Sequence, residues 1–164
     1  MHLDPDFQHL TYGDIRERAK QLRASLNPGD LIVFYAGLRD VRDRGLVYAI
    51  IGLLMVEEFL LATSILPTLR DINAHSRRIL PSSAQDLIVR GRPGVSGRLE
   101  RCVPIGEWRD RAYRVRRDLL AEWGGLSVKG GYLQRSARLP RFFDAARFYD
   151  WFRSKSPILL QTNN

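Results

Sequence analysis

Side chains that could do chemistry gather in three short parts of the sequence. Near the N-terminus, His2, Asp4 and Asp6 alternate; one imidazole and two carboxylates can hold a divalent metal ion, while Asp-Pro-Asp is also typical of a turn. Residues 73–78 combine amide, imidazole, hydroxyl and guanidinium groups in one polar stretch. Residues 94–98 resemble a nucleophile elbow but lack its final glycine. No general acid and base pair up, so we predict that the protein is not an enzyme and needs no cofactor.

Composition favours a polyanionic partner. The 164 residues carry a formal charge of +8 and have a pI of about 10.2, and 23 of the 26 basic residues are arginines. Arginine binds phosphate and guanine edges through a planar fork and stacks on bases, although a GC-rich genome also enriches arginine. The single cysteine, Cys102, excludes an internal disulfide and is expected to be a small core residue in a reducing cytoplasm.

The elements that must position these groups alternate between strands and helices in one domain, residues 1–164. Thr11 is predicted to cap a helix whose buried face consists of Ile15, Ala19, Leu22 and Leu26. Strands are predicted at 29–37 and 47–58, joined by a charged loop. The apolar run at 46–62 contains two glutamates and is too short for a membrane helix, so we interpret it as a buried strand. No secretory signal precedes these elements, which indicates a cytoplasmic protein.

The second half of the chain is predicted to hold two more strands and two helices. Strands are expected at 86–90 and 99–105, on either side of a glycine-rich link. A helix with Ala112, Val115, Leu119 and Trp123 on its buried face is expected to end at Gly124-Gly125, with Arg111 and Arg114 on its outer side. A last helix is expected to begin at Pro140.

The paired strands carry a resemblance to a known superfamily. A turn feeding an apolar strand that ends in two aromatics (29–37), then a charged loop and a second apolar strand interrupted by one glycine (47–58), resembles the central hairpin of PUA-like barrels of the EVE, ASCH and YTH type. The resemblance implies an α/β (α+β) fold: a PUA-like, partly open β-barrel decorated with helices. It also implies nucleic-acid binding, often with one base taken into a pocket.

A second resemblance covers roughly the first half of the chain. His2-Leu3-Asp4-Pro5-Asp6, the strand 29–35, Ile50-Ile51-Gly52-Leu53 and Asn73-Ala74-His75 are similar to a nucleotide-modification-associated domain family known from phage and restriction neighbourhoods. The family's glycine- and alanine-rich second motif is replaced here by residues 15–24. This resemblance implies recognition of modified DNA more than catalysis.

These patterns define the candidate nucleic-acid-binding residues. A base taken out of its stack needs aromatic planes and fixed polar groups at its edge. Tyr35 and Trp108 are candidates for the planes, whereas Trp123 fits a core position. The remaining candidates are polar or cationic: Asp4, Asp6, Asn73, His75 and Ser76 for the base edge, and Arg77, Arg78, Arg111 and Arg114 for phosphates.

We therefore predict a module that recognises a modified base in DNA by extruding it into an aromatic pocket, with nucleic acid as partner, DNA favoured over RNA, and no membrane. Two alternatives stay open at this stage. One is an RNA-binding domain of the same fold; the other is a metal-dependent nucleotide-processing enzyme built on His2, Asp4 and Asp6.

Overall fold

The structure is a computed structural model that describes residues 4–134 and 139–164. Its strands are β1 (Thr11–Asp14), β2 (Leu31–Arg39), β3 (Leu46–Leu61), β4 (Leu87–Gly91), β5 (Gly97–Pro104), β6 (Gly106–Arg109), β7 (Ala112–Val115) and β8 (Leu159–Leu160). Its α-helices are α1 (Arg16–Ser25), α2 (Arg117–Glu122) and α3 (Ala145–Ser154), with 3-10 helices at Ala62–Ser64, Pro67–Ile72 and Lys129–Gly131. The mixed α+β class predicted from the sequence is confirmed.

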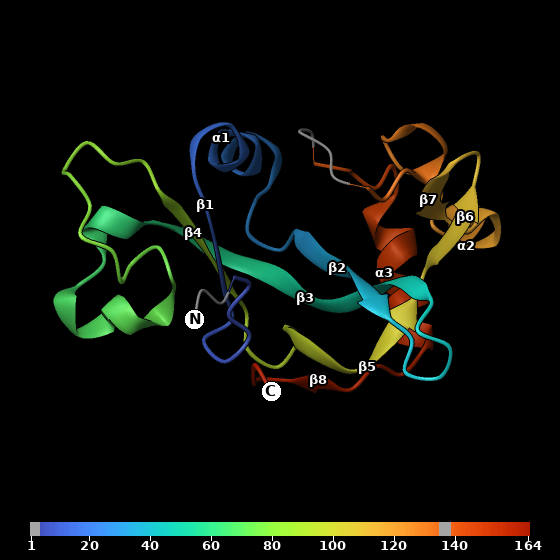
Figure 1. The fold of residues 1–164 in the computed structure, drawn as a ribbon. Coiled ribbons are helices and arrows are strands. Elements are labelled where there is room, and N and C mark those ends of the chain that lie inside the picture. Colours follow the sequence, from blue (N-terminus) through green and yellow to red (C-terminus); the bar gives the residue numbers. More distant parts are fainter. Residues whose placement is uncertain (1–3, 135–138) are drawn as a thin grey trace. The chain divides into compact units, whose positions relative to one another are not determined.

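The strands form one large and one small sheet. In the large sheet the order is β1-β4-β3-β5-β8, with β2 also paired to β3, as Figure 1 shows for the long central strand. Strand β4 runs antiparallel to both β1 and β3, and a register shift between Val56 and Glu58 marks a bulge in β3. Strands β6 and β7 pair antiparallel as a separate hairpin, in which Trp108 faces Tyr113.

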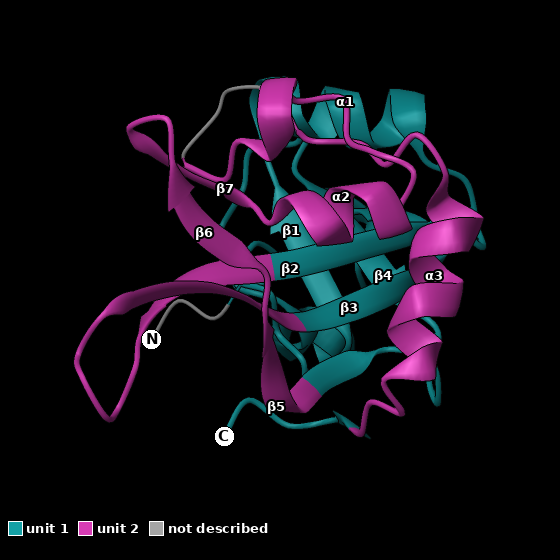
Figure 2. Cartoon of the chain, turned by 90° about the vertical axis from the view of Figure 1, so that its right-hand side faces the viewer, with its two compact units in different colours: residues 1–34, 52–98, 159–164 teal, residues 35–51, 99–158 magenta. Residues whose placement is uncertain are grey.

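The chain divides into two compact units, coloured separately in Figure 2. Unit 1 comprises residues 1–34, 52–98 and 159–164, and unit 2 comprises residues 35–51 and 99–158. The boundaries fall inside β2, β3 and β5, so these strands contribute residues to both units. The expectation of a single domain over 1–164 stays a prediction.

Unit 1 is built on the apolar strands that the sequence predicted. Leu53, Leu54 and Val56 of β3 are fully buried, as are Leu87, Ile88 and Val89 of β4. Helix α1 contributes Ala19 and Leu22, two of the four positions expected on its inner face; the other two, Ile15 and Leu26, flank the helix and are half-buried. The apolar run at 46–62 is a strand, as predicted, and no helix in the described part of the chain is long and apolar enough to cross a membrane.

Unit 2 has an aromatic core between α2 and α3. The Trp123 ring lies edge-on to Phe142, Phe148 and Trp151 at centroid distances of 4.9–5.8 Å. Trp123 is 2 % exposed, which confirms its expected core position. Cys102 is exposed on β5, so its predicted core position is wrong. Only the first and third residues of β5 are buried, and Cys102 lies in the later, exposed part of the strand.

Three predicted helix boundaries are also wrong, each because turn geometry or strand pairing overrides local preference. Residues 11–14 form β1, since they pair with β4, and the Thr11 hydroxyl donates to the carbonyl of Ile72 at 2.5 Å. Residues 112–115 form β7 after a turn at Asp110 and Arg111, both with positive φ. The predicted helix is therefore shorter, and only Arg117–Glu122 form α2. Helix α3 begins five residues after Pro140, where the Asp144 carboxylate accepts the N–H of Arg147 at 2.9 Å.

We expect Gly52→Ala to destabilise the protein. A Cβ at Gly52 would stand 2.5 Å from a ring carbon of Phe7 and 2.6 Å from the backbone oxygen of Gly97, and the latter cannot move without distorting the sheet. The expected loss in free energy of unfolding is about 1–3 kcal/mol, measured by urea denaturation. Gly37→Ala is the control, since its Cβ would meet only side chains, at 3.3 Å or more. Equal stability of Gly52→Ala and wild type would contradict the packing described here.

Candidate nucleic-acid interface

His75 lies between two carboxylates in unit 1. Its Nδ1 is 2.9 Å from the Asp86 carboxylate and its Nε2 is 3.6 Å from that of Asp4. The other oxygen of Asp4 accepts the backbone N–H of Gly13 at 2.8 Å. Gly13 leaves the space for this arrangement, because a Cβ there would collide with the His75 ring. His75 is 7 % exposed, so the pairing of the imidazole with two acids is largely shielded from water.

Asn73 and Ser76 fix the chain on both sides of this imidazole. The Asn73 side chain donates to the Thr11 hydroxyl at 3.1 Å and accepts the backbone N–H of His75 at 2.9 Å. The Ser76 hydroxyl accepts the N–H of Asn73 and donates to the carbonyl of Arg70 at 2.7 Å. Both side chains are buried. Segment 73–76 is therefore held by its own polar groups against β1.

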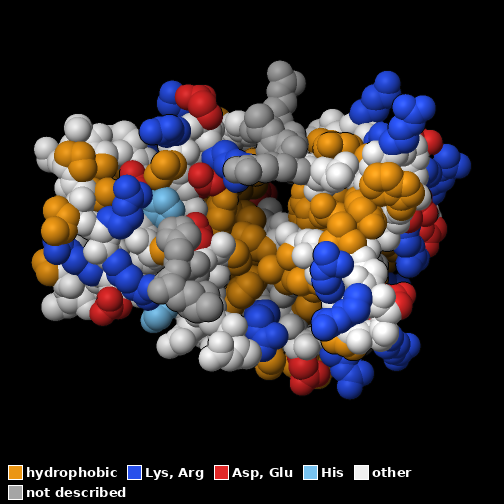
Figure 3. Space-filling view, viewed as in Figure 1, with side chains coloured by type: hydrophobic (Ala, Val, Ile, Leu, Met, Phe, Trp, Pro, Cys, Tyr) orange, Lys and Arg blue, Asp and Glu red, His pale blue; other side chains and the backbone are white. Residues whose placement is uncertain are grey.

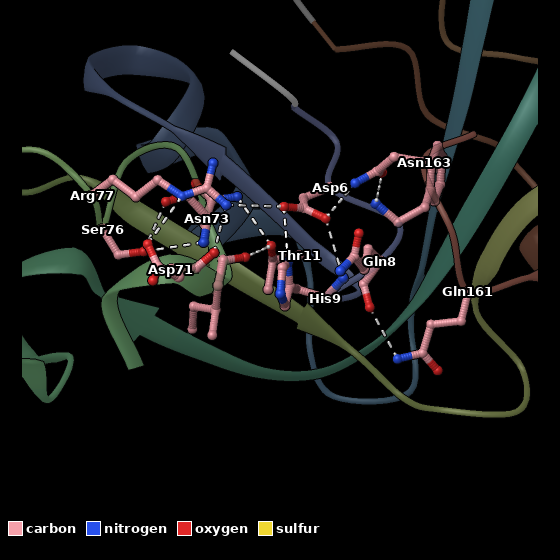
Figure 4. Close-up of polar contacts among 12 residues, drawn as sticks. Asp6, Gln8, His9, Thr11, Asp71, Asn73, Ser76, Arg77, Gln161 and Asn163 are labelled. Atoms are coloured by element: carbon pink, nitrogen blue, oxygen red, sulfur yellow. Dashed lines mark hydrogen bonds and ion pairs between the residues drawn. The ribbon is translucent and has the colours of Figure 1, made fainter. Parts of the chain in front are cut away.

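Asp6 is the centre of a second buried group (Figure 4). Its carboxylate accepts hydrogen bonds from the side chain of Asn163 at 2.9 Å and from His9 at 3.0 Å, and the Arg77 guanidinium lies 3.7 Å away. Burial raises the pKa of the Asp6 carboxyl, but the hydrogen bonds from Asn163 and His9 outweigh it, so the pKa lies below its usual value. An ionised Asp6 thus ties the turn before β1 to the C-terminal residues.

Arg77 and Arg78 reach from these buried acids to the surface. The Arg77 side chain is 37 % exposed and donates to the backbone oxygen of Asp71 at 2.6 Å. The Arg78 side chain is 55 % exposed and lies 3.3 Å from Asp86. Both guanidinium groups therefore stand at the edge of the buried network, where they can also meet phosphate.

The structure brings together the unit 1 residues that the sequence singled out. They form one network, largely buried except for the two arginines, in which the members are linked directly, through Asp86, or through Thr11 and its backbone pairing with Asp6: Asp4, Asp6, Asn73, His75, Ser76, Arg77 and Arg78. This geometry favours a structural role for the buried members, because they bond one another. His2 lies outside the described residues, and among the described ones no three His, Cys, Asp or Glu side chains are placed so that they could hold a metal ion.

Asp86, His9 and Asn163 were missed by sequence reasoning. Asp86 could have been noticed as the acid at the start of the strand predicted at 86–90. Asn163 lies 157 residues from its partner Asp6, and no local pattern signals such a contact.

Unit 2 carries an aromatic row: Tyr35, Tyr48, Tyr113 and Trp108. Neighbouring ring centroids along the row are 6.4, 5.0 and 5.0 Å apart. The Tyr35 hydroxyl donates to the carbonyl of Leu133 at 3.0 Å, which anchors one end. Trp108, at the other end, is 61 % exposed and packs edge-on against Tyr113. The sequence indicated Tyr35 and Trp108 but missed Tyr48, which lies in a correctly predicted strand, and Tyr113, which lies in a strand predicted as a helix.

The two predicted arginines of unit 2 differ in their surroundings. Arg111 is exposed in the β6–β7 turn. The Arg114 side chain is 18 % exposed, donates to the carbonyls of Arg109 and Lys129, and lies 5.7 Å from the centre of the Tyr132 ring. Arg114 therefore braces the β6–β7 hairpin, whereas Arg111 is open to a ligand.

The positive charge is concentrated in unit 2. Its residues include 16 Lys and Arg against 9 Asp and Glu, a net charge of +7, whereas unit 1 has 10 against 9, a net charge of +1. Figure 3 shows dense blue side chains at the right of the view, where Figure 1 labels β6, β7 and α2. The aromatic row thus belongs to the strongly basic unit. Aromatic rings that can stack on bases, together with positive charge for the phosphates, are typical of proteins that bind single-stranded nucleic acid.

Comparison with known families agrees with this chemistry. The profile of the family described as nucleotide modification associated domain 3 matches residues 1–150. The chain belongs to this family. No curated protein and no solved structure matches the chain. Membership of the nucleotide modification associated domain 3 family relates the protein to modified nucleotides and to nucleic acid, and it confirms the second resemblance seen in the sequence.

We expect the stability of the protein to decrease as pH rises above neutrality. The Asp4 carboxylate raises the pKa of His75, burial lowers it, and Asp86 raises it again, so the net pKa lies above its usual value of 6.5. A group whose pKa is higher in the folded than in the unfolded state contributes its full stabilisation at pH values below the unfolded-state pKa. This stabilisation is lost as the pH rises through the folded-state pKa. Urea denaturation at several pH values measures this, and His75→Gln should flatten the decline. An unchanged pH profile in His75→Gln would show that another group causes the decline.

Proposed function

We propose that the protein is a nucleic-acid-binding module that recognises a modified base in DNA, holds that base against the aromatic row of unit 2, and has no chemistry of its own. The observation that carries the proposal is the exposed Trp108 ring, supported edge-on by Tyr113 in a unit of charge +7. Membership of a nucleotide modification associated family supports a modified target. The PUA-like hairpin pattern supports base extrusion. A protein that recognises modified DNA would suit a restriction system.

Base stacking explains why an aromatic ring remains exposed here. A nucleobase offers a flat π-face, and stacking it on an aromatic side chain contributes about 1–3 kcal/mol. The Tyr113 and Trp108 rings meet at 67° and are not stacked face to face, and 61 % of the Trp108 surface stays open to a base. The hydrogen bond of Tyr35 to Leu133 makes the far end of the row rigid, so little side-chain entropy is lost on binding.

Each unit carries exposed arginines of its own that suit phosphate contacts. Arg111 lies in the turn next to Trp108, within unit 2. Arg77 and Arg78 carry partly exposed guanidinium groups that buried carboxylates hold in place in unit 1. Such contacts give affinity without sequence preference, whereas the base contact gives selectivity.

A binding panel tests the proposal as a whole. Single-stranded and double-stranded DNA and RNA, plain or with 5-methylcytosine or 5-hydroxymethylcytosine, are compared by fluorescence anisotropy at two salt concentrations. The proposal expects tighter binding of a modified DNA than of its plain counterpart and recovery of the nucleic acid unchanged after incubation with Mg²⁺ or Mn²⁺. Absence of binding at low salt, or metal-dependent cleavage that Asp4→Asn abolishes, would contradict it.

Salt should weaken nucleic-acid binding steeply, and removal of Arg77 and Arg78, at the edge of the buried network of unit 1, should reduce that dependence. Each phosphate contact with duplex DNA contributes about −0.9 to the slope of log K against log salt. We expect Arg77→Ala with Arg78→Ala to make the slope less negative by about one to two such contacts. Arg90→Ala is a control, because Glu57 and Glu58 already pair with this arginine. An unchanged slope in the double variant would show that Arg77 and Arg78 contact no phosphate.

Replacement of Trp108 by alanine should weaken binding without unfolding the protein. The expected loss is about 1–3 kcal/mol of binding free energy, larger for the preferred modified target than for plain nucleic acid, and leucine should recover only part. The melting temperature should stay near that of wild type, since Trp108 is 61 % exposed. By contrast, Trp123→Ala should cost about 3–5 kcal/mol of stability. Unchanged binding of both targets by Trp108→Ala would exclude the stacking assignment.

A further inference from the structure

The connection between β2 and β3 is a tightly ordered turn within unit 2. Its ends are closed by a hydrogen bond from the N–H of Asp40 to the carbonyl of Gly45 at 2.9 Å. The Asp40 and Asp43 carboxylates accept the backbone N–H groups of Arg42 and Gly45, at 2.8 and 2.7 Å. Both acids thus accept hydrogen bonds within the turn, which brace the tip of the hairpin from inside.

An apolar side chain stands at the tip of this turn. Val41 is 90 % exposed, and the two leucines that flank the turn, Leu38 and Leu46, are 36 % and 40 % exposed. A single exposed valine is ordinary on a protein surface. Three exposed apolar side chains on one hairpin, whose turn is closed by hydrogen bonds, are instead suited to enter another molecule.

Arginines alternate with these apolar side chains. Arg39 donates to the carbonyl of Arg44 at 3.1 Å, which stiffens the hairpin. Among the described residues, no hydrogen bond or ion pair engages the guanidinium groups of Arg42 and Arg44. The tip therefore carries one exposed apolar side chain, Val41, followed within three residues by two cations that suit phosphates.

We propose that Val41 is a wedge that enters the base stack of duplex DNA and helps to extrude the recognised base, while Arg42 and Arg44 bind the neighbouring phosphates. This inference rests on the proposed function and adds the residue that opens the duplex. Proteins that kink or unstack DNA insert apolar side chains between base steps and hold the backbone with arginine. Because valine is β-branched and stiff at χ1, little side-chain entropy is lost on insertion.

The aromatic row begins on the same hairpin. Tyr35 lies on β2 and Tyr48 on β3, so the wedge and two of the rings belong to one continuous piece of chain, residues 35–51 of unit 2. A duplex occupant is favoured over a lipid surface for that reason. Stacked bases match both a wedge and a row of rings, whereas a membrane would match only the apolar and basic tip.

Fluorescence of 2-aminopurine tests the wedge. Short DNA duplexes carry this base next to cytosine, 5-methylcytosine or 5-hydroxymethylcytosine, and its emission rises when the neighbouring base leaves the stack. We expect the full-length wild-type protein to raise the emission at saturation on at least the modified duplexes. Val41→Ser should lower that rise to less than half, and Val41→Leu should preserve it. Leu66→Ser is the matched control, because Leu66 is an exposed apolar residue of unit 1.

The outcomes separate the wedge from the proposed function. An equal rise with wild type and Val41→Ser, at saturating protein, overturns the wedge and leaves the binding proposal standing. Absence of any nucleic-acid binding by wild type overturns both. Binding of phosphatidylserine–phosphatidylcholine vesicles that is lost in Val41→Ser, without a 2-aminopurine response, assigns the tip to a membrane instead. Thermal melting of each variant confirms that the change at this exposed position leaves the fold intact.

Discussion

The ion cluster of His75 with Asp4 and Asp86 is the interaction on which the architecture of unit 1 depends. It joins three segments that are distant in sequence: the turn before β1, the polar stretch 73–78 and the residue that leads into β4. Acids buried without a cation would be strongly destabilising, so each segment needs the others in place. Gly13 supplies the room for the imidazole, which explains why a strand interior accepts a glycine here.

This cluster changes how the residues of the sequence motifs are understood. Asp4, Asn73 and His75 carry the resemblance to the nucleotide modification associated family, and in the structure their polar groups hold one another within unit 1. Their hydrogen bonds and ion pairs therefore stabilise mainly the fold of unit 1. Exposed groups suited to nucleic acid remain on the rim, in Arg77 and Arg78, and above all in unit 2, where the aromatic row and most of the net charge lie.

The sequence predicted those parts of the fold that follow from local patterns. The strands β2 to β5, the inner face of α1, the buried Trp123 and the exposed Trp108 all agree with the structure. Strands β1 and β7 were missed because their short sequences also fit a helical period, and only pairing with β4 and β6 decides between the two. The contacts of Asp86 and Asn163 could not be predicted, since they depend on long-range closure of the chain.

The central claim is that Trp108 stacks on a base, and intrinsic fluorescence tests it most directly. Of the three tryptophans, Trp108 is 61 % exposed, whereas Trp123 and Trp151 are 2 % and 7 % exposed, so quenching by a bound base reports on Trp108. Titration with a single-stranded DNA oligonucleotide should quench the emission, and an oligonucleotide of equal length with abasic sites, which keeps the phosphates, should bind with little quenching. Saturable binding of the base-bearing strand with unchanged tryptophan emission would contradict the account.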